Sequence, residues 1–138
     1  MAFRSRQQVR HPDIDRAGIV YFPRFYDFFH RALEDFFHTE AGVDWWDLAD
    51  RLGVAFPLVH IETDFARPLQ HGDMVTLQLS TAKLGAHSVV LRFEVFRPDE
   101  EKPASVSSLV LCCIGLPGWK KAPIPEKLRA AFERHRAG

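Results

Sequence analysis

The sequence predicts an α+β domain in which an antiparallel β-sheet wraps around one long apolar helix. Three observations lead to this prediction. Apolar residues recur with the helical period after residue 23, they alternate with period two in stretches after residue 53, and short turn-like segments separate those stretches. Short connections favour antiparallel pairing, and a helix so rich in Phe needs a sheet to cover it. The length of 138 residues suits one domain over 1–138.

The first predicted elements are a short extended segment, a loop and the long helix. Residues 3–10 favour an extended strand, while a proline and a glycine favour a loop over 11–18. The helix is predicted to have Pro23 at its first position, where the N–H would be unpaired anyway, and to end near 41–42. A shorter second helix is expected over 44–52. The apolar stripe of the long helix contains Phe25, Phe29, Ala32 and Phe36, widened by Tyr26, Leu33 and Phe37.

The second half of the chain is predicted to form four strands and a final helix. Strands with alternating apolar residues are expected over 59–66, 75–81 and 89–96, and an almost continuously apolar central strand over 109–114. Because the turn-like separators are short, consecutive strands are expected to be antiparallel neighbours. A basic helix is expected over 125–136.

Composition and charge argue against several classes of protein. Lys+Arg and Asp+Glu both number 18, which argues against a polyanion binder and predicts no nucleic-acid partner. No stretch approaches the ~20 apolar residues that span a bilayer, and the first residues lack the apolar core of a signal peptide. We therefore expect a soluble, cytoplasmic protein with no membrane partner. The adjacent Cys112 and Cys113 are expected to be reduced thiols, because neighbours in a strand point to opposite faces.

The densest polar group precedes the long helix and has the sequence His11-Pro-Asp13-Ile-Asp15-Arg16. Asp15 approaches the helix start, where unpaired N–H groups and the positive end of the helix dipole lie. Such a carboxylate offers a nucleophile or general base beside a site for a developing oxyanion. A simpler alternative is that Asp13 or Asp15 only caps the loop or helix. A third interpretation makes His11, Asp13 and Asp15 metal ligands that share one face of an extended segment.

The run from Asp15 to Tyr26, D-R-A-G-I-V-Y-F-P-R-F-Y, resembles the signature of hotdog-fold thioesterases of the 4-hydroxybenzoyl-CoA thioesterase family. In that signature an aspartate is followed by a glycine three positions later, then by apolar and aromatic residues and a proline. The resemblance is strong over about 9–37 and looser to about residue 117. It implies a single hotdog domain that hydrolyses an acyl-CoA thioester without a cofactor or metal, and it disfavours a mere capping role for Asp15.

The resemblance implies a role for each part of this loop. Asp15 would attack the thioester carbonyl or activate a water, Gly18 would permit the tight approach into the helix, and the backbone N–H of Phe22 would bond the thioester oxygen. Tyr21 and helix aromatics such as Phe25 would line an acyl pocket. Aromatic walls suit an aryl group and equally accept a short aliphatic chain.

The resemblance also implies a homodimer or homotetramer with sites between subunits. Residues around Phe56 to His60 would then reach a partner's substrate. One departure concerns the ring hydroxyl of the substrate: where the hydroxybenzoyl enzyme has an acidic residue for this group, the present helix has His30. This departure puts a para-hydroxyl substrate in doubt, although a histidine can still bond a polar substituent.

A second departure concerns the nucleotide of CoA. The turn expected to lie near its phosphates carries only Lys83 and His87, so Arg92 or the basic segment 119–138 are alternative contacts. The sequence as a whole predicts an acyl-CoA thioesterase for an aryl (benzoyl- or hydroxybenzoyl-like) or short-chain acyl group. The alternative from another class is a non-catalytic module on the same fold that binds acyl-CoA or an acyl carrier protein.

Overall fold

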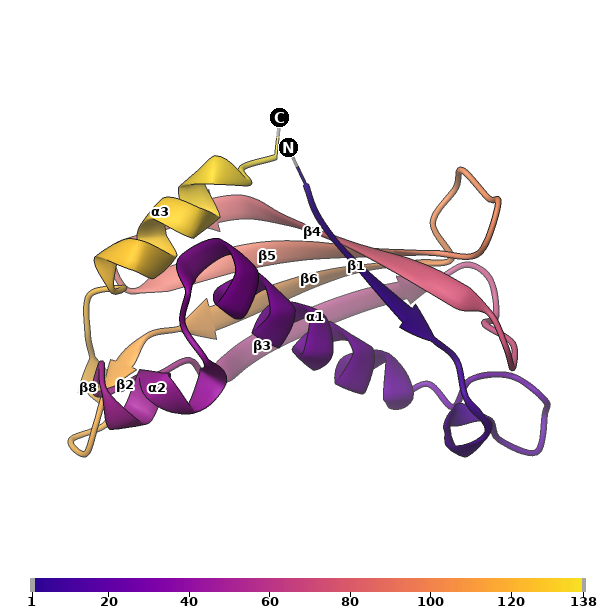
Figure 1. Cartoon of the computed structure of the whole chain (residues 1–138), viewed down its shortest axis with the longest axis horizontal. Coiled ribbons are helices and arrows are strands. Elements are labelled where there is room, and N and C mark those ends of the chain that lie inside the picture. Colours follow the sequence, from indigo (N-terminus) through magenta and orange to yellow (C-terminus); the bar gives the residue numbers. More distant parts are fainter. Residues whose placement is uncertain (1, 138) are drawn as a thin grey trace.

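A computed structural model describes residues 2–137 and places one long helix across a five-stranded antiparallel sheet (Figure 1). The sheet has the order β1-β4-β5-β6-β3. Its strands are β1 (Phe3–Gln8), β3 (Leu58–Phe65), β4 (Met74–Leu84), β5 (Ser88–Phe96) and β6 (Ser105–Cys112). The helices are α1 (Arg24–Ala41), α2 (Trp45–Asp50) and α3 (Glu126–Arg134), and a 3₁₀ turn spans His11–Asp13. These elements confirm the predicted α+β architecture.

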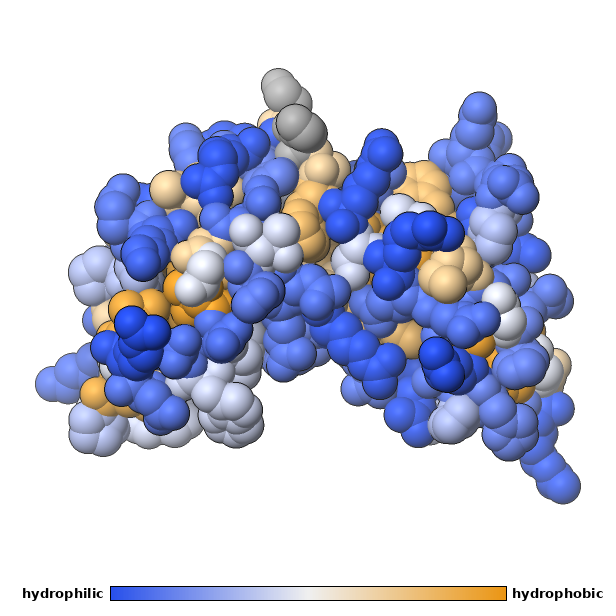
Figure 2. Space-filling model, viewed as in Figure 1, coloured by the Kyte–Doolittle hydropathy of each residue, from blue (hydrophilic) through white to orange (hydrophobic). Residues whose placement is uncertain are grey.

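Helix α1 lies close to its predicted bounds, with Pro23 at the position that precedes its first residue. It ends at Gly42, whose φ of 65° is left-handed and whose N–H bonds the carbonyl oxygen of His38. Its buried residues are Phe25, Phe28, Phe29, Ala32, Leu33, Phe36 and Phe37. The opposite face is exposed and hydrophilic (Figure 2). The sheet therefore covers the apolar side of α1 and leaves its polar side exposed.

The predicted adjacency of β3 and β4 is wrong. Strand β1 pairs with β4, whereas β3 pairs with β6 at the opposite edge of the sheet. The connecting segment 66–73 crosses three strand spacings, about 14 Å at ~4.8 Å each. Its eight residues reach roughly 26 Å when extended. A connection of this length is thus long enough for a crossover as well as for a hairpin. The strand that pairs with β4 at the sheet edge is β1.

Strand β6 begins four residues earlier and ends two residues earlier than predicted. Ser105 and Ser107 face the interior with 1% exposure each, and Ser107 Oγ lies 2.8 Å from Thr63 Oγ1 of β3. Ser105 Oγ is buried without a hydrogen-bond partner. Because these inward positions carry serines, an apolar pattern did not mark this part of the strand. The sequence also gave no sign of a small sheet formed by β2 (Val54–Ala55), β7 (Ile114–Gly115) and β8 (Lys120–Lys121).

The C-terminal helix completes the core over the carboxyl half of α1. The ring of Phe132 stacks on that of Phe36, with centroids 5.6 Å apart, and Thr81 Oγ1 of β4 donates to the carbonyl oxygen of Phe132. The His135 ring contacts the Glu40 carboxylate at the end of α1. Cys112 and Cys113 are free, as predicted, and burial raises the pKa of the Cys113 thiol to about 11. Among the residues described, no helix is long and apolar enough to cross a membrane.

We predict that Phe36→Ala lowers the free energy of unfolding by about 3–5 kcal/mol, because it removes a fully buried ring and leaves a cavity. The control is Trp46→Ala, whose ring is 78% exposed. This control should change the free energy of unfolding by less than about 0.5 kcal/mol. Urea denaturation followed by circular dichroism measures both, and equal losses would contradict the assignment of the core.

Candidate active site

The loop before α1 is a closed turn that presents the carboxylate of Asp15. The backbone N–H of Asp15 bonds the carbonyl oxygen of Ile19 at 3.0 Å, and the N–H of Gly18 bonds the carbonyl oxygen of Asp15 at 3.0 Å. Asp15 Oδ1 accepts the N–H of Ala17 at 2.8 Å, which fixes the carboxylate and leaves its other oxygen for a ligand. Gly18 has φ of 82°, a left-handed conformation that only glycine adopts readily. The sequence placed both residues in this loop, and the turn shows why Gly18 is needed.

The junction between this loop and α1 presents an unpaired backbone donor. The N–H of Tyr21 bonds the carbonyl oxygen of Asp13, and the N–H groups of Arg24 and Phe25 bond carbonyl oxygens of the junction itself. Within residues 2–137, the N–H of Phe22 has no hydrogen-bond acceptor, and the Phe22 ring is 57% exposed. The positive end of the α1 dipole lies at this position. A free donor beside a helix amino terminus is suited to an oxyanion, as expected for Phe22.

Two open pockets flank the junction. One, of about 440 Å³, has Asp15 and Tyr21 among its walls, together with Arg16 and Arg24. The other, of about 390 Å³, is almost entirely apolar and has Phe22 and Phe25 on one side. Its remaining wall is formed by Ile19, Val20, Phe65 and residues 66–69. Asp15 and Tyr21 thus share one pocket and Phe22 and Phe25 the other.

A third pocket, of about 360 Å³, lies between α1, α2 and the β3 edge. It contains two of the residues expected to bind substrate, His30 and Phe56, together with Trp45. The His30 ring is half exposed, lies 4.5 Å from the Trp45 ring and has Nδ1 3.6 Å from Glu34 Oε1. Phe56 is buried against Phe37, with ring centroids 5.7 Å apart. Within one chain this pocket is distinct from the two pockets that flank the loop before α1.

Lys83 and His87 lie at the end of the sheet opposite the loop of Asp15. Strand β4 begins at Met74, near that loop, and ends at Leu84, beside α3 (Figure 1). Nine residues of strand separate Met74 from Lys83, which corresponds to roughly 30 Å. Both Lys83 and His87 are exposed. One chain therefore does not bring these two side chains to Asp15.

The proposed metal set does not come together. The 3₁₀ turn over His11–Asp13 replaces the extended segment that this interpretation required. Asp13 is buried, and its Oδ2 accepts the N–H of Arg10 at 2.9 Å while His11 is exposed. Across residues 2–137, no three His, Cys, Asp or Glu side chains are grouped as metal ligands. Asp13 instead stabilises the turn, which agrees with the alternative that this residue only caps the loop.

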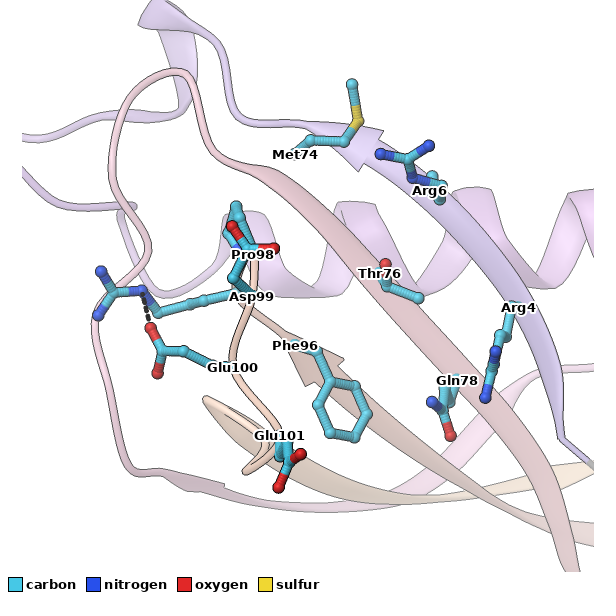
Figure 3. A pocket seen from close by; sticks show the side chains of 11 residues that line it. Arg4, Arg6, Met74, Thr76, Gln78, Phe96, Pro98, Asp99, Glu100 and Glu101 are labelled. Carbon is cyan, nitrogen blue, oxygen red and sulfur yellow. Dashed lines mark ion pairs between the residues drawn. The ribbon is translucent and has the colours of Figure 1, made fainter.

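A hollow of about 580 Å³ lies on the outer face of the sheet, away from Asp15 (Figure 3). Arg4 and Arg6 of β1 border one side, and Asp99 and Glu101 of the β5–β6 loop border the other. Phe96 lies between them. This hollow is larger than the pockets beside Asp15, but it holds none of the residues that the sequence analysis selected.

Comparison with known proteins identifies the family. A family model described as the thioesterase-like superfamily matches residues 9–132. This chain belongs to that superfamily. A 1,4-dihydroxy-2-naphthoyl-CoA hydrolase from Synechocystis sp. is 30% identical over 130 residues, which are 94% of each chain. Another from Acaryochloris marina is 32% identical over 127 residues, or 91% of this chain and 92% of the relative.

Solved structures of thioesterases share the fold. The crystal structure of a 1,4-dihydroxy-2-naphthoyl-CoA thioesterase from Synechocystis has a TM-score of 0.87 and 29% identity, covering 96% of each chain. A gentisyl-coenzyme A thioesterase has a TM-score of 0.81 and 26% identity, covering 94% of this chain and 99% of that one. The expected hotdog fold, family and reaction class, thioester hydrolysis, are confirmed.

The sequence did not indicate that the β3–β4 crossover forms one wall of the candidate site. Residues 66–69 line the pocket beside Phe22, and the carbonyl oxygen of Leu69 accepts the N–H of Val20 at 2.9 Å. The sequence predicts a short turn between neighbouring strands at this segment. The available signal was Leu69 itself, an apolar residue in a polar connection that proves to be fully buried.

We predict that Gly18→Ala lowers the free energy of unfolding by about 1–2 kcal/mol, because its φ is left-handed although the space around it is open. Gly18→Asn should cost less, since Asn tolerates this conformation better. Gly118→Ala is the control, with equally open space and no left-handed φ. Urea titration of the three variants measures the differences, and equal effects of the two alanines would contradict this account.

Proposed function

We propose that this thioesterase hydrolyses an aryl or short-chain acyl-CoA, with Asp15 as the essential carboxylate. One observation carries the proposal: the loop that holds the carboxylate of Asp15 leads directly into the junction with α1, where the N–H of Phe22 is unpaired. The first is a nucleophile or base, and the second is a donor for the charge that develops on the thioester oxygen. A module that only binds acyl-CoA has no need of a carboxylate at this position.

In the proposed reaction, both groups act on the thioester carbonyl. Asp15 either attacks the thioester carbonyl carbon or takes a proton from the water that attacks it. The carbonyl oxygen gains negative charge, which the N–H of Phe22 and the α1 dipole stabilise. The carbon–sulfur bond then breaks, CoA leaves as a thiol after protonation, and water supplies the oxygen of the free acid. An acyl anhydride on Asp15 forms only in the first of these two routes.

Aromatic side chains and the named relatives favour an aryl acyl group. Phe22 and Phe25 line the apolar pocket beside the junction, and Tyr21 lines the other pocket that flanks the junction. The relatives compared above act, by their names, on 1,4-dihydroxy-2-naphthoyl-CoA and gentisyl-CoA, two hydroxylated aryl esters. His30 supplies a polar group for such a substituent, in a pocket whose other lining residues, apart from Asp27, are apolar or aromatic.

The open edge of the sheet supports a homodimer as the active assembly. Strand β3 lies at the sheet edge, and its Leu58, Val59 and Phe65 are 48%, 59% and 47% exposed. A long edge strand with exposed apolar residues invites pairing with another strand. Antiparallel pairing of β3 with its own copy covers this edge by a two-fold axis. It also brings the Leu58 end of one copy towards the Phe65 end of the other.

This pairing accounts for the site residues that one chain leaves apart. Phe56 and His30 border the pocket at the Leu58 end of β3, whereas Phe22 and Phe25 border the pocket at the Phe65 end. Two-fold pairing sets the first pocket of one copy beside the second pocket of its partner. The same pairing brings Lys83 and His87 nearer to the partner's Asp15, where the charge of Lys83 suits the phosphates of CoA. The substrate therefore lies between two copies.

We predict that Asp15→Asn lowers kcat at least about a hundredfold, because Asn keeps the Oδ1 acceptor but lacks the charge needed for attack or proton transfer. Thiol release from benzoyl-, hydroxybenzoyl-, phenylacetyl- and short aliphatic CoA esters measures turnover. Asp50→Asn, an exposed residue at the end of α2, serves as the control and should be unaffected. Near-full turnover by Asp15→Asn would refute the catalytic role, and binding of the esters without hydrolysis by the unmodified chain would favour the binding module.

We predict that Val59→Glu yields a monomer with kcat/KM lowered at least about tenfold, since each copy would bring a carboxylate to the β3 edge and separate the two halves of the site. Light scattering coupled to size-exclusion chromatography gives the mass, and thiol release gives the activity. Leu52→Glu is the control, an exposed apolar residue away from β3. A fully active monomer would contradict the shared site.

A further inference from the structure

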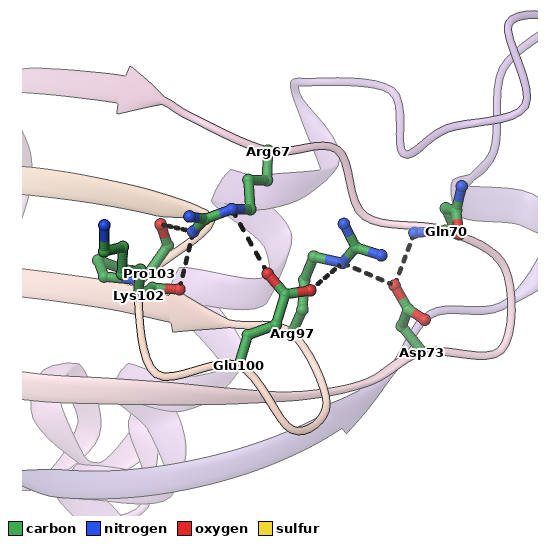
Figure 4. Close-up of polar contacts among 7 residues, drawn as sticks. All are labelled: Arg67, Gln70, Asp73, Arg97, Glu100, Lys102 and Pro103. Carbon is green, nitrogen blue, oxygen red and sulfur yellow. Dashed lines mark hydrogen bonds and ion pairs between the residues drawn. The ribbon is translucent and has the colours of Figure 1, made fainter.

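Four charged residues join the β3–β4 crossover to the β5–β6 loop. They alternate in sign in the order Arg67, Glu100, Arg97 and Asp73, and their side chains are 18–34% exposed (Figure 4). We propose that this network, with Glu100 at its centre, positions the loop that carries Asp15 and the N–H of Phe22. The catalytic meaning of the proposal rests on the proposed function, whereas the structural coupling does not.

The network fixes the first part of the crossover. Arg67 Nε lies 3.4 Å from Glu100 Oε1, and Arg67 Nη1 donates to the carbonyl oxygens of Lys102 at 3.1 Å and Pro103 at 3.3 Å (Figure 4). The backbone N–H groups of Arg67 and the residue before it bond the carbonyl oxygen of Ala104. A planar guanidinium with several donors is suited to hold three acceptors at once. The start of the crossover is therefore tied to the β5–β6 loop.

The same network fixes the last part of the crossover. Arg97 Nε lies 3.1 Å from Glu100 Oε2 and 4.0 Å from Asp73 Oδ2. Asp73 Oδ2 also accepts the backbone N–H of Gln70 at 2.9 Å, which closes the turn before β4. Glu100 thus bridges two arginines. Its neutralisation leaves the two guanidinium groups facing each other in a partly buried place without the intervening charge.

Between these two anchors, the crossover touches the catalytic loop. Leu69 is fully buried, and its carbonyl oxygen accepts the N–H of Val20 at 2.9 Å. Val20 also pairs with Ile14 across the base of the Asp15 turn, and it precedes the free donor of Phe22 by two residues. A shift of the crossover is therefore transmitted to both catalytic groups through one hydrogen bond and one apolar contact surface.

The kinetic signature of this arrangement is a change in kcat. An oxyanion donor acts most strongly in the transition state, so its displacement lowers turnover more than it weakens ground-state binding. Glu100 lines none of the three pockets that surround the candidate acyl site. Its removal therefore deletes no group that would bind the acyl chain there.

The test compares Glu100→Gln with the matched control Glu94→Gln. Glu94 also pairs with one arginine, Arg92 at 3.5 Å, and is 25% exposed, but it belongs to β5 on the outer face of the sheet. In Glu100→Gln, the Val20 amide should exchange with solvent at least about tenfold faster by NMR, because its acceptor is less firmly held. The kcat should fall about tenfold with KM within about twofold, while the control leaves exchange and kinetics unchanged.

The outcomes separate this proposal from the proposed function. Unchanged exchange at Val20 in Glu100→Gln, or equal changes in the control, overturns the positioning role. Faster exchange in Glu100→Gln alone, in a chain that hydrolyses no thioester, supports the coupling and refutes the proposed function instead. If Glu100→Gln does not fold, Arg67→Lys provides the measurement, since it keeps the charge and loses the fork that reaches the two carbonyl oxygens. Val20 exchange as slow as in the unmodified chain would then overturn the proposal.

Discussion

The one-sided burial of α1 against the sheet is the constraint on which the other features depend. Seven apolar or aromatic residues of the helix are buried, and at its carboxyl half Phe36 and Phe37 contact Phe132 of α3. This packing fixes the axis of the helix and so fixes where its amino terminus points. In the proposed mechanism, the N–H of Phe22 and the helix dipole act on the oxyanion only if that terminus is rigid, because a donor aligned in advance needs no reorganisation during the reaction. In the proposed mechanism, the core therefore supports the chemistry by holding this terminus in place.

The second requirement is a loop that holds a charged carboxylate beside this terminus. The turn closed by Asp15, Gly18 and Ile19 meets it locally, through three hydrogen bonds and one left-handed glycine. A turn of this size has little core of its own, so its position depends on what lies behind it. The crossover at 66–73 supplies that support, with the buried Leu69 under Val20. Charge pairs anchor the crossover at both ends because a surface connection has few apolar contacts with which to hold itself.

The sequence predicted those parts of the fold and site that depend on local patterns. Helical spacing of Phe residues located α1, alternation located β4 and β5, and the motif from Asp15 to Tyr26 indicated the loop and its donor. Strand order depends on contacts between distant segments, so the alternation in β3 gave no sign that this strand lies at the far edge. The small strands and the start of β6 with its inward serines were not predicted for a related reason. Polar or very short strands show no periodic pattern of apolar residues. The pocket wall formed by residues 66–69 was not predicted, because a crossover and a hairpin turn have the same composition here.

The remaining feature to explain is why expected site residues are spread over the length of the chain. A single helix covers the sheet on one side only, so the pocket of His30 and Phe56 and the junction of Phe22 open separately along α1. Enclosing a substrate requires a further apolar wall, and the chain carries its most exposed strand apolar groups on β3. In the antiparallel two-fold pairing proposed for that edge, two pockets that are far apart within one copy lie close together between copies. Under this proposal, closure of the site and burial of the β3 edge follow from one contact, so that assembly and catalysis depend on the same residues.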